Sequence, residues 1–381
     1  NAALLGTVTR FEYDALGRKT RQIDALGRAT RFDYTVRGEL ASRMRPMGQS
    51  ESFDYDPQGN LEARVDFMGR STTYAYNGLN QVRERLLPDG TAHAFTYFPG
   101  GQRSSFTMSS GGVSATTSFV LDNRNRLATQ VNPDTTLVAW EYDAAGNRTS
   151  VRTPSGLVTY SWTARNELSQ VFRGAQLWSS YTYDDVGNRQ SVAYANGTVQ
   201  TLAYNAKNQL TQIQNTAGQA VISSYGYTVD PRGLRTSVVE HTGRRVDYRY
   251  DALRRLVEEA VTEAGVGTAT TYTLDSVGNR LAKRTAKPGG VLEATGYAYN
   301  DNDELLTENG PDGLVSYGYN ANGETTSKAS IAGGALYHWD ADGRMVGFQS
   351  AGTTASFTYD VDGIRLAKSA NGQATRFLVD K

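Results

Sequence analysis

Residues 11–18 read Phe11-Glu12-Tyr13-Asp14-Ala15-Leu16-Gly17-Arg18, and variants of this stretch recur along the whole chain. With the second aromatic residue numbered as position zero, we count seventeen copies, spaced 20 to 25 residues apart and most often 21. A fixed period of this size is typical of a repeat architecture. We therefore predict a single tandem array over residues 1–381.

The aromatic residues of the repeat predict extended strands. Position −2 is aromatic in sixteen copies and position zero in fourteen. Side chains two residues apart lie on the same face of a strand, and aromatic pairs on neighbouring strands stabilise a sheet by about 0.2–1 kcal/mol each. We expect aromatic ladders built from the position-zero residues Tyr13, Tyr34, Tyr55, Tyr76, Tyr97, Tyr142, Trp162, Tyr183, Tyr204, Tyr250, Tyr299, Tyr319, Trp339 and Tyr359.

Positions +1 and +4 predict a tight turn after each aromatic pair. Position +1 is Asp in ten copies and Asn in four, and these side chains accept hydrogen bonds from the backbone about two residues on. Position +4 is Gly in eleven copies and Asn in four, as expected where the backbone enters the left-handed region after a type I turn; Arg254 does not fit. The predicted turn residues include Asp14, Gly17, Asp56, Gly59, Asn80, Asn125, Asp143, Gly146, Asn166, Asp184, Gly187, Asn208, Gly233, Gly278, Gly323, Gly343 and Gly363.

A second turn is expected between consecutive copies. Asp89-Gly90, Asn196-Gly197, Asp312-Gly313 and Asn371-Gly372 are strong hairpin signals when extended sequence flanks them. Each repeat is therefore strand, turn, strand, turn, and the fold class is all-β with antiparallel hairpins. From the copy at residue 76 to the copy at 299, an aliphatic residue at +6 alternates with Arg, which we interpret as inward-facing aliphatic and solvated Arg side chains.

The composition excludes several classes of function. Basic and acidic residues number 39 each, so the charge gives no reason to expect binding to nucleic acid or to an anionic membrane surface. Cysteine is absent, and no apolar run approaches the roughly 20 residues of a membrane span. Asn1-Ala2-Ala3-Leu4-Leu5 does not resemble a signal peptide, and both ends continue repeat-like sequence, so we expect a fragment of a longer protein.

Several copies resemble the YD repeats of the Rhs family, which includes bacterial polymorphic toxins, the C component of Tc toxins and the YD shell of teneurins. They are Tyr13-Asp14-Ala15-Leu16-Gly17-Arg18, Tyr55-Asp56-Pro57-Gln58-Gly59-Asn60, Tyr142-Asp143-Ala144-Ala145-Gly146-Asn147-Arg148 and Tyr183-Asp184-Asp185-Val186-Gly187-Asn188-Arg189. The resemblance implies a curved, spiralling antiparallel sheet that forms part of a hollow shell.

The resemblance also implies a partner and a place of action. Bacterial relatives enclose a variable C-terminal toxin or effector domain, with the remaining shell segments as partners, and are secreted or associated with a secretion system or the cell surface. The stretch from Tyr359-Asp360 to Asp380 looks like the segment before the family's Rhs core, which carries an aspartate-based self-cleavage site. Residues 1–381 contain no such core, so no catalytic residue is transferred, and we expect no enzyme activity and no cofactor.

Other candidate chemistry is better explained by the repeat. His93, His241 and His338 are too scattered for a metal site. The segments Asp340-Ala341-Asp342-Gly343 and Asp360-Val361-Asp362-Gly363 coincide with turns and lack the other ligands of a calcium-binding loop. Asp184-Asp185 is an acid pair of the kind that 39 acidic residues produce by coincidence.

Three alternatives stay open at this point. A β-propeller would use the four strands of a double repeat as one blade. A surface adhesion or carbohydrate-binding module would present Trp162, Trp178 and Trp339 to solvent in a groove. A glycosidase comes third.

Overall fold

The computed structural model describes residues 8–379, and this range is built from β-strands and tight turns. It contains 35 strands and one short 3-10 turn, η2 (Pro288–Gly290). No helix in this range is long and apolar enough to cross a membrane. The predicted all-β fold class is confirmed.

The chain divides into two compact units that are described separately. Unit 1 comprises Asn1–Ser118, Leu274–Ala282 and Ala294–Lys381, and unit 2 comprises Phe119–Thr273 and Lys283–Glu293. Four strands have residues in both units: β11 (Val113–Leu121), β25 (Val266–Leu274), β26 (Arg280–Ala286) and β27 (Leu292–Tyr299).

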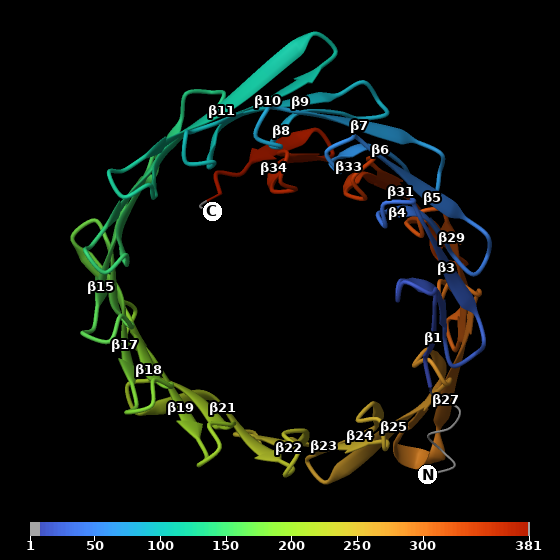
Figure 1. Ribbon diagram of the computed structural model, residues 1–381. Helices are drawn as coiled ribbons and strands as arrows, with labels where there is room; N and C mark the ends of the chain where they lie inside the picture. Colours follow the sequence, from blue (N-terminus) through green and yellow to red (C-terminus); the bar gives the residue numbers. More distant parts are fainter. Residues whose placement is uncertain (1–7, 380–381) are drawn as a thin grey trace. The chain divides into compact units, whose positions relative to one another are not determined.

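Unit 2 is a continuous antiparallel meander, coloured green to yellow in Figure 1. Each strand from β12 to β25 pairs with the next one in the chain. Its strands are β12 (Leu127–Val131), β13 (Leu137–Tyr142), β14 (Arg148–Thr153), β15 (Gly156–Trp162), β16 (Leu168–Arg173), β17 (Gln176–Tyr183), β18 (Arg189–Tyr194), β19 (Thr198–Tyr204), β20 (Leu210–Ala217), β21 (Ala220–Val229), β22 (Arg235–Glu240), β23 (Arg245–Tyr250), β24 (Leu256–Glu263) and β25 (Val266–Leu274). Propeller blades are separate four-stranded sheets. The unbroken pairing shows that the propeller alternative is wrong.

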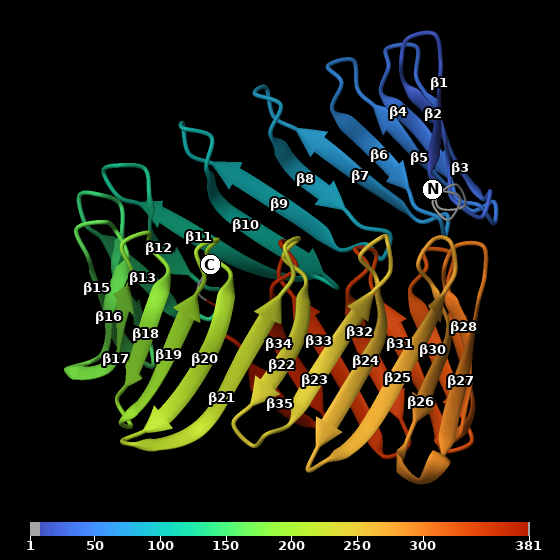
Figure 2. The ribbon, with the colours of Figure 1, turned by 90° about the horizontal axis from the view of Figure 1, so that it is seen from below.

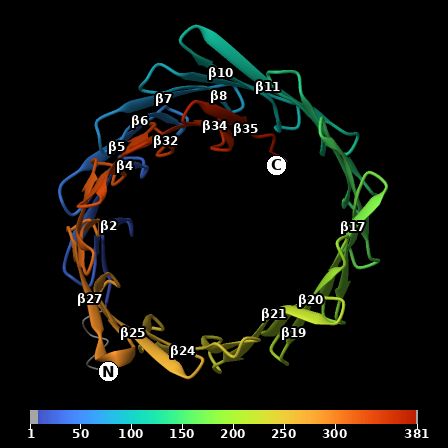
Figure 3. The ribbon, with the colours of Figure 1, turned by 180° about the vertical axis from the view of Figure 1, so that it is seen from behind.

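Unit 1 contains two such meanders, which we call the N-terminal array and the C-terminal array. The N-terminal array consists of β1 (Arg10–Tyr13), β2 (Lys19–Ile23), β3 (Ala29–Tyr34), β4 (Leu40–Met44), β5 (Ser50–Tyr55), β6 (Leu61–Val65), β7 (Ser71–Tyr76), β8 (Val82–Leu86), β9 (Ala92–Tyr97) and β10 (Arg103–Ser110). The C-terminal array consists of β27, β28 (Leu305–Gly310), β29 (Gly313–Tyr319), β30 (Thr325–Ser330), β31 (Gly333–Trp339), β32 (Met345–Ser350), β33 (Thr353–Tyr359), β34 (Arg365–Ala370) and β35 (Gln373–Arg376). Figures 2 and 3 show the two arrays, coloured blue and orange to red, lying along each other within this unit.

The wall formed by these strands is one sheet thick. The accessible surface is 21955 Å², whereas a compact protein of 41.5 kDa exposes roughly 15,000 Å². Only nine apolar residues in the described range are buried, and Val138, Trp140 and Val151 in unit 2 form a cluster of them. Strand-to-strand hydrogen bonds and cross-strand side-chain pairs therefore hold the structure together more than a central core does.

Candidate functional site: the YD turns and the seam of unit 1

Every copy of the repeat forms the same turn, which we call the YD turn and which runs from position +1 to position +5. In the copy centred on Tyr142, Asp143 N–H donates to the carbonyl of Asn147 at 2.9 Å, and Gly146 N–H donates to the carbonyl of Asp143 at 3.3 Å. The strand pairing slips by one residue between Glu141 and Tyr142, just before the turn. This is the geometry of a type I turn followed by a left-handed residue in a bulge.

All seventeen residues at position +4 have a positive φ angle. Gly146 has φ +97° and Asn166 has φ +63°, and Arg254, which did not fit the residue preference, has φ +64°. Glycine enters this region without steric cost, and Asn does so more readily than other residues. The backbone requirement therefore explains the Gly and Asn of this position, and Arg254 adopts the same conformation without the preferred side chain.

In most copies the side chain at +1 is paired with the side chain at +5, a relation that the sequence reasoning missed; Phe98, Asp230 and Asp360 are exceptions. Asp143 Oδ1 accepts from the N–H of Asn147 at 2.8 Å, and its Oδ2 accepts from Asn147 Nδ2 at 2.9 Å. The hydrogen bond from the Asn147 side chain is the largest of the interactions that hold the pKa of Asp143 below its usual range. Where +1 is Asn, as at Asn77, the +5 residue is an acceptor such as Gln81, whose Oε1 accepts from Asn77 Nδ2 at 2.8 Å. The signal was present, because +5 is Gln or Glu in every copy with Asn or Thr at +1.

The aromatic residue at position zero donates a hydrogen bond to the backbone of the preceding hairpin. Tyr183 Oη donates to the carbonyl of Leu168 at 2.9 Å, and Trp162 Nε1 donates to the carbonyl of Arg148 at 2.8 Å. The acceptor is in each case position +6 of the preceding copy, and the same bond is made by Tyr34, Tyr55, Tyr76, Tyr97, Tyr142, Tyr204, Tyr250, Tyr319, Trp339 and Tyr359. Phe is absent from position zero but frequent at −2, which is the sequence signal for this role.

Replacing Tyr183 with Phe is expected to lower the free energy of unfolding by about 0.5–1.5 kcal/mol, the usual net value of one hydrogen bond. The ring and its packing are retained, so the loss reports the bond to the Leu168 carbonyl alone. Urea unfolding followed by circular dichroism measures it. Tyr13→Phe is the control, because the Tyr13 side chain belongs to the first copy and is 60% exposed; equal losses in the two variants would contradict the assignment.

Of the Arg side chains at +6 that were expected to be solvated, Arg189, Arg235 and Arg280 are exposed, and some of these Arg side chains also lie over an aromatic ring. The guanidinium of Arg235 lies 4.2 Å from the ring centroid of Tyr227, and that of Arg103 lies 5.6 Å from the ring of Phe95. In both cases the ring is position −2 of the same copy, so the Arg covers the aromatic face while its head group stays near water.

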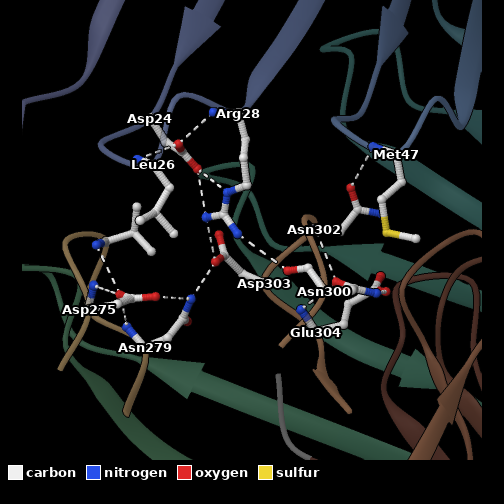
Figure 4. Close-up of polar contacts among 12 residues, drawn as sticks. Asp24, Leu26, Arg28, Met47, Asp275, Asn279, Asn300, Asn302, Asp303 and Glu304 are labelled. Carbon is white, nitrogen blue, oxygen red and sulfur yellow. Dashed lines mark hydrogen bonds and ion pairs between the residues drawn. The ribbon is translucent and has the colours of Figure 1, made fainter. Parts of the chain in front are cut away.

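The second group of polar contacts forms a seam between the N-terminal and C-terminal arrays of unit 1. Arg28 lies at its start, where Nη2 donates to Asp303 Oδ1 at 2.7 Å (Figure 4). The same Asp303 oxygen accepts from Asn279 Nδ2 in the turn before β26, so one carboxylate contacts both the N-terminal array and the preceding YD turn. Asp24 holds the Arg28 side chain from its own turn. Burial alone would raise the pKa of Asp24. Hydrogen bonds lower this pKa below its usual value, and the strongest of them comes from the Arg28 side chain.

The seam continues along both arrays. Asn302 accepts from the N–H of Met47 at 3.3 Å, and Arg45 Nη1 donates to the carbonyl of Ala321 at 3.2 Å. Farther along, Asn322 Nδ2 donates to Asp66 Oδ2 at 3.0 Å. Arg85 pairs with Asp342, and Arg103 with Asp362, in the same order. These contacts join residues 253 to 276 positions apart, and the repeat period alone did not indicate them.

The remaining candidate residues serve the turns or the seam. Asp340 accepts from the N–H groups of Asp342 and Arg344, as a turn-initiating Asp does. Asp184 makes the same contacts with Val186 and Asn188. In residues 8–379 no group of three or more His, Asp or Glu side chains is placed to hold a metal ion. His93 is fully buried beside the Arg85–Asp342 pair.

These features define a class of protein: an antiparallel hairpin-repeat wall whose repeat is built around a Tyr-Asp turn. The RHS Repeat family model matches residues 3–29, 122–158, 180–220 and 229–266. These matches confirm RHS repeats in four segments of the chain, in agreement with the resemblance to the Rhs, or YD-repeat, family that its sequence indicated.

Relatives with known names include a nuclease and a toxin. The chain is 26% identical over 233 residues to the tRNA3(Ser)-specific nuclease WapA of Bacillus spizizenii. Its fold is similar to a chain of the Photorhabdus luminescens Tc holotoxin pore, with a TM-score of 0.55 and 13% identity over 96% of this chain. A chain in a crystal structure of TcdB2-TccC3 gives a TM-score of 0.57 and 14% identity over 97% of this chain. The expected sheet of tandem YD hairpins, of the kind that forms the Tc toxin shell, is confirmed by these matches.

The chain spans only part of each relative. The match to the WapA nuclease includes 60% of this chain but only 9% of the nuclease. The matches to the two toxin chains include 24% and 25% of those chains. What is shared with the toxin chains is the fold of the wall.

Proposed function

We propose that this chain is a wall segment of an Rhs-type shell that encloses an effector and isolates it from its surroundings. The observation that supports this most directly is the unbroken pairing of β12 to β25 in unit 2, in a sheet with very little core. A thin sheet whose backbone groups are paired strand to strand is stable without a compact centre, because each hairpin is stabilised by its neighbours. Such a wall separates two spaces, and a globular domain of the same length does not.

The partners in this proposal are the remaining shell segments and a C-terminal effector. Secretion, or association with a secretion system or the cell surface of a bacterium, follows from the same proposal, because the matched solved structures are toxin complexes. In this proposal the wall has a structural role, and catalytic activity belongs to the enclosed effector.

The test uses the natural-length polypeptide that contains residues 1–381. We expect its effector segment to be cut by a protease at least tenfold more slowly under native conditions than after denaturation in urea, because the wall blocks access. The rate for a free copy of the effector, mixed with the same wall, is the control. Cleavage of the attached effector as fast as the free copy would contradict enclosure.

A glycan-binding module is the second candidate, and one observation favours it. Trp178 and Tyr194 are neighbours in unit 2 and are 47% and 41% exposed, forming one side of a groove with Gln176 and Asn196. Trp162 and Trp339, in contrast, are half-buried and donate hydrogen bonds into the sheet. A glycan array distinguishes the two candidates. A glycan that binds the wild-type chain but not the Trp178→Ala variant would favour the glycan-binding module.

A further inference from the structure

Position +3, at the tip of the YD turn, is one of two positions whose side chains reach neighbouring turns; the other is +5, as in Arg18 and Asn147. Arg37 donates to the carbonyl of Asp56 at 2.7 Å, and Arg124 donates to the carbonyl of Ala144 at 2.7 Å. In both cases the acceptor lies in the YD turn of the following copy. The residue at +3 therefore contributes to what the tip of each turn can bind.

The residue type at +3 changes abruptly near the end of the chain. The first thirteen copies have Leu, Arg, Gln, Gly, Ala, Val or Lys there, and none has Asn or Asp. The last four copies have Asn302, Asn322, Asp342 and Asp362. All four of these residues contact the N-terminal array across the seam, beside other contacts such as that of Asp303 with Arg28.

The four contacts are ordered and are of three chemical kinds. Asn302 Nδ2 donates to Gln49 Oε1 at 3.0 Å, and Asn322 Nδ2 donates to Asp66 Oδ2 at 3.0 Å. The two Asp residues that follow meet Arg85 and Arg103. The separation along the chain stays between 253 and 259 residues, so successive turns of one array meet successive hairpins of the other.

A shift of the C-terminal array by one repeat breaks this match in either direction. In one direction Asp342 would face Asp66, which places two carboxylates together. In the other direction Asn322 would face Arg85, which leaves that guanidinium without its carboxylate. Like-charge contacts and lost partners are the usual means by which a polar interface rejects wrong registers.

We propose that Asn302, Asn322, Asp342 and Asp362 are specificity-determining residues that set the register of the seam in unit 1. They select which YD turn of the C-terminal array lies against which hairpin of the N-terminal array. This role is independent of any enclosed effector and does not rest on the proposed function.

The experiment measures the register directly with spin labels. The chain has no cysteine, so Met47→Cys and Asp301→Cys introduce one labelled pair at exposed positions on the two sides of the seam. Double electron–electron resonance should give one narrow distance. A slip by one repeat moves a label by two strands, or about 10 Å at the usual strand spacing.

Asp342→Arg is expected to broaden this distance or shift it by about 10 Å, because two guanidinium groups then face each other at Arg85. The exchanged pair Arg85→Asp with Asp342→Arg should restore the narrow distance. Asp312→Arg is the matched control: it makes the same charge change at an exposed turn of the C-terminal array. An unchanged distance in Asp342→Arg, or a failure of the exchange to restore it, would overturn the proposal.

A second variant serves if Asp342→Arg does not fold. Asn322→Asp keeps the size of the side chain and places a carboxylate against the buried Asp66. We expect the distance to broaden at neutral pH and to narrow again when acid neutralises the added carboxylate. A narrow distance at both pH values would also overturn the proposal.

Discussion

Replacing Trp140 with Ala is expected to lower the free energy of unfolding of unit 2 by about 3–5 kcal/mol, the range for a large aromatic residue removed from a core. Trp140 is 3% exposed and packs with Val138 and Val151 in a buried cluster. Because the wall is one sheet thick, few neighbouring side chains can move into the space that the indole leaves. Hydrogen exchange should therefore accelerate most in β13 and β14, whose amides border this cluster.

The control for this prediction is Trp178→Ala in the same unit. The chemical change is identical, but Trp178 is 47% exposed at the start of β17. Trp178→Ala should lower the free energy of unfolding by well under half as much as Trp140→Ala does. Urea unfolding of the two variants side by side measures the difference. Equal costs would show that the buried cluster around Val138 is not a centre of stability in this unit.

The hairpin and its turn were predictable from the sequence because their causes are local. A positive φ at Gly146 or Asn166 is required by the turn itself, so the residue type reports the backbone directly. The same holds for Asp143, whose carboxylate binds backbone N–H groups within four residues. Seventeen copies repeat this local information, which is why the strand and turn assignment needed no tertiary knowledge.

The contacts between copies were missed, although part of their signal was present. The hydroxyl of Tyr183 reaches a carbonyl fifteen residues earlier, and only the absence of Phe at position zero indicates such a bond. The seam is less accessible to sequence reasoning, because Asn322 and Asp66 lie 256 residues apart. A periodic chain offers many equivalent registers, and its period does not select one of them. The change of residue type at +3 breaks that equivalence.

His93 was interpreted from the sequence as one of three scattered histidines, and its burial has a consequence for stability in acid. It is 0% exposed, and within the described residues neither ring nitrogen has a hydrogen-bond partner. Burial, reinforced by the positive charge of Arg85, lowers the pKa of His93 from 6.5 to about 4. Arg344 acts in the same direction, whereas Asp342 and Asp89 oppose it.

This shift fixes the sign of the pH dependence. The unfolded chain binds a proton at His93 near pH 6.5, before the folded chain does near pH 4, so protons favour the unfolded state between these values. The stabilising contribution is complete above pH 6.5, falls as the pH decreases, and is lost by about pH 4. Its full size is at most about 3 kcal/mol, from 1.36 kcal/mol per pKa unit.

Replacing His93 with Gln should therefore flatten the stability of unit 1 between pH 6.5 and pH 4, measured by urea unfolding at a series of pH values. Asp24 and Asp66 do not produce the same signal, because their lowered pKa values place their loss of stability below about pH 4. His241 and His338 are exposed, so His241→Gln and His338→Gln should leave the acid slope unchanged. Two results would contradict this prediction: a wild-type free energy of unfolding that does not fall between pH 6.5 and pH 4, or a fall of the same size in His93→Gln. Either result would show that protonation of His93 does not destabilise the fold.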